Sequence, residues 1–104
     1  MGFVDRSRIP KVTPVALTTA NIEYSHTFRF DTVAFEVKNR AAAVLRYSWA
    51  TGGVASGAAD GIYMSLPSGG VYSRDNVKLE DPHRTIYLAS DAGGEYAEVE
   101  EWTR

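Results

Sequence analysis

The chain has 104 residues, a formal net charge of −2 and no cysteine. This length suits a single domain with one core, and 44% hydrophobic with 23% charged residues is a typical globular composition. The absence of cysteine excludes disulfides, thiolate zinc sites and cysteine nucleophiles, and the small negative charge gives no reason to expect nucleic-acid binding.

Residues 1–14 are expected to form an N-terminal arm, and residues 15–104 a single domain. Pro10 and Pro14 disfavour regular strand pairing in the arm. The arm has no apolar centre of the kind found in signal peptides, and no segment approaches the ~20 apolar residues of a membrane span. We therefore expect no membrane association, and a protein that works where it is made or leaves the cell within a larger assembly.

The two ends of the chain differ in charge. Arg6, Arg8 and Lys11 make the arm locally basic, whereas residues 91–104 contain five acidic residues and one basic residue. Opposite charges at the two ends favour contacts between copies of the chain. The three basic residues are therefore candidate interface residues, with two unrelated solvated ends as the alternative.

The first half of the chain alternates apolar with polar residues, a pattern that predicts half-buried β-strands. Aromatic and β-branched residues are frequent at the apolar positions. The expected strands cover residues 15–17, 22–30, 33–37 and 44–49.

The second half begins with a small, glycine-rich stretch at residues 50–61, which is expected to be a surface loop. A further strand is expected at residues 62–66, and two short strands at 71–72 and 77–79 flank a polar turn at 73–76. The last two strands, 85–90 and 96–102, are expected to pair as a hairpin across a turn at 91–94. Turn signals at this spacing predict an all-β fold, either an antiparallel, jelly-roll-like β-sandwich or a small barrel of about 7–8 short strands.

Residues capable of catalysis are few and do not form a recognisable motif. His26 is expected to be a locally satisfied strand residue, and His83 a solvated turn residue. Glu98, Glu100 and Glu101 cluster near the C-terminus. Glu98 and Glu100 share one strand face, which is better explained as a solvated surface than as a cation site. We predict no enzymatic activity, no metal and no cofactor.

Three aromatic residues are expected to be exposed. Tyr63 and Tyr72 lie near glycine-rich loops, and Trp102 falls on the same alternating face as Glu98 and Glu100. Core packing accounts for most aromatic residues in a small domain. Exposed ones stack on sugar rings or anchor protein interfaces, so both a glycan and a protein partner remain open.

The segment 85–102, which reads TIYLASDAGGEYAEVEEW, resembles the end of small β-sandwich virion proteins of tailed bacteriophages. The segments 16–25 (ALTTANIEYS) and 66–72 (LPSGGVY) are also similar. The similarity covers residues 15–103 and does not include the arm.

This resemblance implies a non-enzymatic structural component of a virion, made in the host cytoplasm and present in many copies. Capsid decoration, head–tail connection and tail attachment are all compatible with it. The implied partners are further copies of the chain and other virion proteins. The exposed aromatic residues support an alternative, a carbohydrate- or receptor-binding β-sandwich module.

Overall fold

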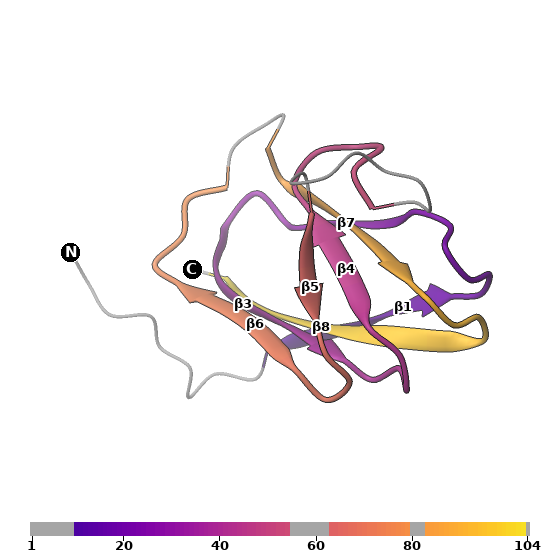
Figure 1. Cartoon of the computed structure of the whole chain (residues 1–104). Helices are drawn as coiled ribbons and strands as arrows, with labels where there is room; N and C mark the ends of the chain where they lie inside the picture. Colours follow the sequence, from indigo (N-terminus) through magenta and orange to yellow (C-terminus); the bar gives the residue numbers. More distant parts are fainter. Residues whose placement is uncertain (1–9, 55–62, 80–82, 104) are drawn as a thin grey trace.

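The computed structural model describes residues 10–54, 63–79 and 83–103. Within these ranges the chain forms eight strands in two four-stranded antiparallel sheets that face each other (Figure 1). The predicted all-β sandwich is confirmed. The strands are β1 (Lys11–Leu17), β2 (Tyr24–Thr27), β3 (Thr32–Asn39), β4 (Leu45–Ser48), β5 (Met64–Leu66), β6 (Val71–Asp75), β7 (Thr85–Ser90) and β8 (Glu95–Thr103).

The two sheets differ in their strand order. Sheet A has the order β1-β8-β3-β6, and sheet B has the order β2-β7-β4-β5. In sheet A the edges are therefore β1 and β6, and in sheet B they are β2 and β5. Each sheet places its more buried strands in the middle, where side chains on the inner face meet those of the other sheet.

The core lies between the two inner faces. The period of two directs every second side chain of each strand inward, so both sheets contribute apolar side chains to a single cluster. The fully buried members include Leu17, Phe35, Val37 and Val99 from sheet A and Leu45, Ile86 and Leu88 from sheet B.

The first strand starts earlier than expected. Residues 11–14, assigned to the arm from sequence, belong to β1, and Pro14 lies opposite Glu98 of β8. β1 is an edge strand, and an edge strand tolerates proline because one side of its backbone has no hydrogen-bonding neighbour. The proline was therefore a poor boundary signal here.

The polar turn expected at residues 73–76 is wrong. β6 continues through Asp75, and the turn comes at Asn76, which has a φ of 54°. Residues 77–79 form no strand, although the N–H of Val77 donates to the carbonyl of Val33 over 2.9 Å. β6 pairs instead with β3. Ser73 and Asp75 lie on the outer side of an edge strand, where polar residues do not interrupt pairing.

The hairpin expected between the last two strands is also wrong. β7 pairs with β2 and β4 in sheet B, whereas β8 pairs with β1 and β3 in sheet A. The turn at residues 91–94 therefore crosses from one sheet to the other. It is fixed by two backbone hydrogen bonds, from Gly94 N–H to Thr18 O over 2.9 Å and from Asp91 N–H to Val44 O over 3.3 Å.

Candidate functional site

A groove with a volume of about 310 Å³ opens at the β6 edge of the sandwich. Phe35 of β3, Trp49 directly after β4 and Tyr72 of β6 line it. Trp49 falls on the inner face of sheet B because it continues the alternation of Leu45 and Tyr47. The groove is thus formed where the aromatic end of the core reaches the sheet edge.

The aromatic rings of this groove are held by each other. Phe35 contacts Trp49 edge-to-face at a centroid distance of 5.8 Å and Tyr72 edge-to-face at 5.5 Å. Tyr72 also stacks on Tyr47, with centroids 4.6 Å apart, and its hydroxyl accepts a hydrogen bond from Trp49 Nε1 over 3.3 Å. Burial, and then the adjacent Tyr72, raise the pKa of Tyr47. The rings of Trp49 and Tyr72, the two aromatic residues of the groove that carry a polar group, therefore have fixed positions.

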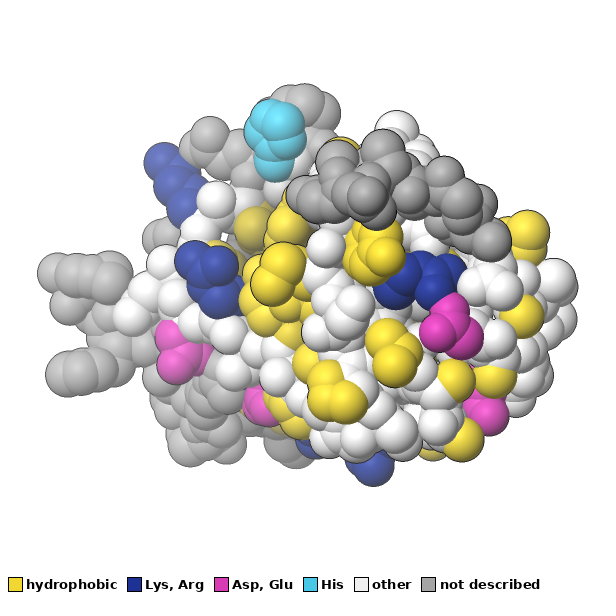
Figure 2. All heavy atoms as spheres, viewed as in Figure 1, with side chains coloured by type: hydrophobic (Ala, Val, Ile, Leu, Met, Phe, Trp, Pro, Cys, Tyr) yellow, Lys and Arg dark blue, Asp and Glu magenta, His cyan; other side chains and the backbone are white. Residues whose placement is uncertain are grey.

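The rim of the groove is polar and carries both signs of charge. Arg74 lies opposite Phe35 in the β3–β6 register, and Asp75, Asn76 and Lys78 follow it around the turn. In Figure 2, basic side chains lie beside apolar ones over the end of β6. An aromatic wall with charged and amide groups at one rim is an arrangement suited to a small polar ligand.

A second feature is a charged residue inside the sandwich. Glu101 of β8 is only 1% exposed and points between the sheets. Its Oε1 accepts hydrogen bonds from the backbone N–H of Arg29 over 3.0 Å and from the hydroxyl of Thr32 over 2.9 Å. Its Oε2 lies 2.9 Å from Nε2 of His26 in β2. The carboxylate thus connects the edge of sheet B to the middle of sheet A.

These contacts determine the charge state of Glu101. Burial alone would raise its pKa, but the hydrogen bonds from His26, Arg29 and Thr32 outweigh burial and lower the pKa to about 2. A β-bulge makes the Thr32 contact possible. β3 contains one extra residue between Thr32 and Ala34 relative to β8, and this extra residue turns Thr32 inward.

His26 also lines a wider cleft of about 550 Å³ between the edge strands β1 and β2, with Thr13, Glu23 and Tyr87 among its other lining residues. Glu101 lies behind His26 and does not reach this cleft. Across the described ranges, no group of three or more His, Cys, Asp or Glu side chains is placed to hold a metal ion. The hydrogen bonds of Glu101 give it a structural role, as a link between the sheets.

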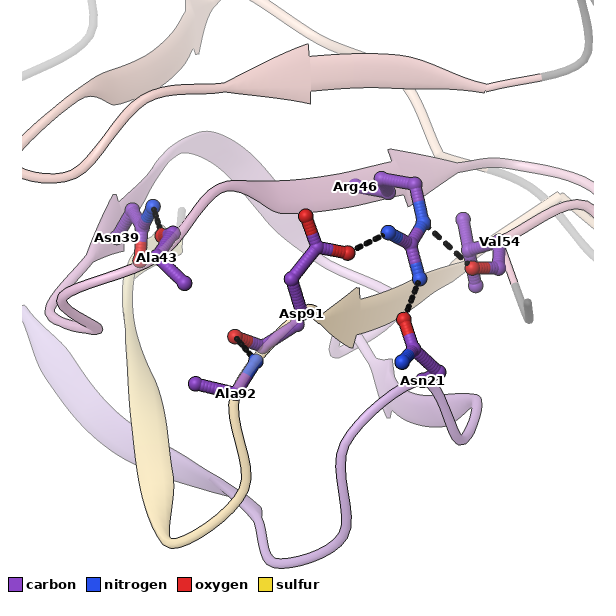
Figure 3. Close-up of polar contacts among 8 residues, drawn as sticks. Asn21, Asn39, Ala43, Arg46, Val54, Asp91 and Ala92 are labelled. Carbon is purple, nitrogen blue, oxygen red and sulfur yellow. Dashed lines mark hydrogen bonds and ion pairs between the residues drawn. The ribbon is translucent and has the colours of Figure 1, made fainter.

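Arg46 organises the outer side of sheet B. Its Nε donates to the carbonyl of Val54 over 2.9 Å, and its two terminal nitrogens contact Asn21 Oδ1, also over 2.9 Å, and the carboxylate of Asp91 (Figure 3). The guanidinium carbon lies 5.9 Å from the ring centroid of Tyr63. One side chain thus joins β4 to three connecting segments, which places Arg46 in the framework of the fold.

The aromatic residues singled out from sequence have three different environments. Tyr72 lines the groove, and Tyr63 is half-buried beside Arg46. Trp102 is only 6% exposed, so the expectation that it is a surface aromatic is wrong. Trp49 is instead the tryptophan that lines the groove. Its alternation with Tyr47 was visible in the sequence, but the open sheet edge beside it was not.

The basic residues of the arm are only partly described. Lys11 is exposed at the start of β1, and Arg6 and Arg8 lie outside the described residues. The role of these three residues as interface contacts stays a prediction.

An apolar strip covers the outer face of sheet A at its β1 edge. Val12, Pro14 and Ala16 point outward on alternate positions of β1, and all three are exposed. Tyr96, the direct partner of Ala16 on β8, is 44% exposed. These four residues form what we call the β1 strip. Three consecutive outward positions without one polar side chain are unusual on a solvated face.

Ion pairs border the β1 strip. Glu98 and Glu100 follow Tyr96 on the same face of β8. Glu100 accepts a hydrogen bond from Lys38 over 2.8 Å, which is the main reason that the pKa of Lys38 is raised. Glu98 pairs with Arg40 over 3.1 Å. Glu98 and Glu100 were predicted to form a solvated surface. They are instead half-buried and paired with basic residues.

Comparisons with protein-family models, with curated proteins and with solved structures found no match to this chain. In the described part of the chain, no helix is long and apolar enough to cross a membrane. The two-sheet β-sandwich, with a groove at the β6 edge and the β1 strip at the other, is thus the basis for assigning a function.

Proposed function

We propose that this chain is a non-enzymatic virion structural protein of a tailed bacteriophage, which assembles in many copies on a capsid or tail. The observation that carries the proposal is the β1 strip. The resemblance of segments 16–25, 66–72 and 85–102 to phage virion proteins supports the same class, and the sandwich fold is the one that this resemblance implies. In the particle, the contacts of the chain are with other copies and with other virion proteins.

The β1 strip has the composition of a contact surface. Protein interfaces combine an apolar centre with a polar rim, and the strip is bordered by the Lys38–Glu100 and Arg40–Glu98 ion pairs. At the same time Pro14 removes one N–H from the edge of β1. A proline on an edge strand opposes the addition of a foreign strand. The strip therefore favours face-on packing against a neighbour over extension of the sheet.

The proposal is tested by comparing two variants of the full chain. Val12→Ser with Tyr96→Ser removes the two large exposed side chains of the strip, which are 51% and 44% exposed. Met64→Ser is the matched control, because Met64 is 61% exposed but lies on β5 in sheet B. Circular dichroism and thermal unfolding establish that each variant is folded.

The readouts are the mass in solution by light scattering over a concentration series and the amount of chain in purified particles. We expect the strip variant to lose self-association or particle incorporation by about tenfold or more, a loss equivalent to about 1.4 kcal/mol. The Met64 control should behave as the wild type. Absence of the chain from particles, or wild-type incorporation of the strip variant, would contradict the proposal.

A further inference from the structure

We propose that the groove at the β6 edge binds a carboxylate-bearing sugar of the uronic-acid type. Trp49 and Tyr72 form its apolar wall, and Arg74 is the residue that recognises the carboxylate. The β1 strip and the groove lie on opposite edges of sheet A, because β1 and β6 are its outermost strands. The inference therefore does not depend on the assembly role proposed above.

The size and lining of the groove favour a sugar. Its volume of about 310 Å³ is at the lower end of small-molecule sites, which suits one or two rings rather than a long polymer segment. Two half-buried aromatic side chains, Trp49 and Tyr72, offer apolar surface against which the C–H face of a pyranose can pack. Asn76 at the rim has an amide with one acceptor oxygen and two donor hydrogens, which are the groups that sugar hydroxyls require.

The aromatic wall is already in place before any ligand arrives. Tyr72 is fixed by stacking on Tyr47 and by the hydrogen bond from Trp49 Nε1, while Trp49 packs against Phe35 and Phe28. A ligand that binds rings with fixed positions does not have to order them, so less binding free energy is lost to side-chain entropy. This favours measurable affinity in a site that is small and open.

The charges at the rim select for an acidic sugar. Among the described residues that line the groove, Arg74 and Lys78 are positive and Asp75 is negative, so these residues sum to a positive charge although the whole chain carries −2. The planar guanidinium of arginine matches a carboxylate with two parallel hydrogen bonds. Arg74 is exposed and lies opposite Phe35, directly beside the aromatic wall. A single carboxylate on the ligand is enough to pair with this positive charge.

The test uses intrinsic fluorescence. The chain has two tryptophans, so Trp102→Phe leaves Trp49 in the groove as the only tryptophan reporter. This variant is titrated with digalacturonate, with the neutral disaccharide galactobiose and with acetate. Calorimetry of the wild-type chain with the same three probes checks that the removal of the buried Trp102 has not altered the groove.

We expect digalacturonate to change Trp49 emission saturably and to bind more tightly than galactobiose. Arg74→Ala should weaken digalacturonate binding about tenfold or more, the loss expected for a hydrogen bond to a charged group, and leave galactobiose almost unchanged. Arg40→Ala is the matched control, because Arg40 directly follows the last residue of β3 and does not line the groove. It should change the affinity for neither sugar.

Three outcomes would overturn the inference. No saturable response to either sugar up to about 10 mM would exclude a sugar site of useful affinity. Equal affinity for the acidic and neutral sugars would show that Arg74 does not recognise the carboxylate. Full competition by acetate at the same concentration would reduce the groove to a simple anion site. The oligomer and particle assays described for the β1 strip read none of these quantities, so the two proposals fail separately.

Discussion

Replacing Glu101 with glutamine removes one negative charge from the interior of the sandwich while preserving the shape of the side chain. The carboxylate accepts from the Arg29 N–H, the Thr32 hydroxyl and His26 Nε2. An amide has one oxygen and one donating NH₂ group, so it cannot accept on both sides as the carboxylate does. At least one of the three partners then faces a donor instead of an acceptor.

The magnitude follows from the charge state of Glu101. Its pKa is lowered from the ordinary 4.5 to about 2, which corresponds to about 3 kcal/mol of folding free energy at neutral pH. Because the folded-state pKa is depressed, this contribution is fully present above pH 4.5 and is lost as the pH falls towards 2. At pH 7 we expect Glu101→Gln to lower the unfolding free energy by about 3 kcal/mol and the melting temperature by roughly 10–20 °C.

Urea unfolding followed by tryptophan fluorescence measures this difference at a series of pH values. Urea is preferred to guanidinium because it is uncharged and does not screen the carboxylate. The quantity of interest is the unfolding free energy of the wild type minus that of the variant. Other carboxylates titrate in the same range, but their effects are present in both proteins and cancel in the difference.

The matched control is Glu98→Gln, because Glu98 is in the same strand but lies on the outer face in one ion pair with the exposed Arg40. We expect it to change the unfolding free energy by less than about 1 kcal/mol. An equal effect of Glu101→Gln on the unfolding free energy at pH 2 and at pH 7 would contradict this prediction, since a loss of packing alone does not depend on pH.

Three further substitutions test separate parts of the framework. Arg46→Lys keeps the charge but loses the fork that reaches Val54 and Asn21, so urea unfolding should show a loss of about 1–3 kcal/mol. Gly93→Ala would place a Cβ only 2.9 Å from a backbone carbonyl oxygen, that of Thr18, and calorimetry should show a lower melting temperature by an amount equivalent to about 1–3 kcal/mol. Pro14→Val restores an N–H to the edge of β1, and heating at high concentration should then give more turbidity than the wild type, at a similar melting temperature.

The alternation of apolar residues was sufficient to predict most strands and the sandwich class. It worked best where a strand has one apolar and one polar face, as in β3, where the inward Phe35 and Val37 alternate with the half-buried Glu36 and Lys38. The same local pattern could not predict which strands pair. β7 and β8 read as a hairpin because each has an apolar face and a turn lies between them. The apolar faces of β7 and β8 meet across the core instead, because each strand pairs with other strands of its own sheet.

The role of Glu101 was hidden for a similar reason. Its inward direction follows from the alternation of Ala97 and Val99, so the register alone placed a carboxylate in the core. Its partners come from residues about 70 positions away in sequence, and Thr32 faces it only because of the bulge in β3. Tertiary contacts of this kind leave no local signal. The sequence could indicate the anomaly but not the hydrogen bonds that stabilise it.

The positions of the β1 strip and the groove lead to a last prediction, that assembly and ligand binding are thermodynamically independent. The two surfaces are separated by the full width of sheet A, with β8 and β3 between them. The groove rings are held by contacts within the core, and no residue of the strip takes part in those contacts. A neighbour packed face-on against the β1 strip covers the outer face of sheet A at its β1 edge, whereas the groove lies at the β6 edge and is lined by the inward-facing Phe35, Trp49 and Tyr72. Digalacturonate should bind the oligomeric or particle-bound chain and the Val12→Ser, Tyr96→Ser variant with affinities within about twofold of each other, which calorimetry at matched groove concentration can measure. A tenfold difference would mean either that a neighbouring copy covers the groove or that the two edges of sheet A are coupled through β3 and β8.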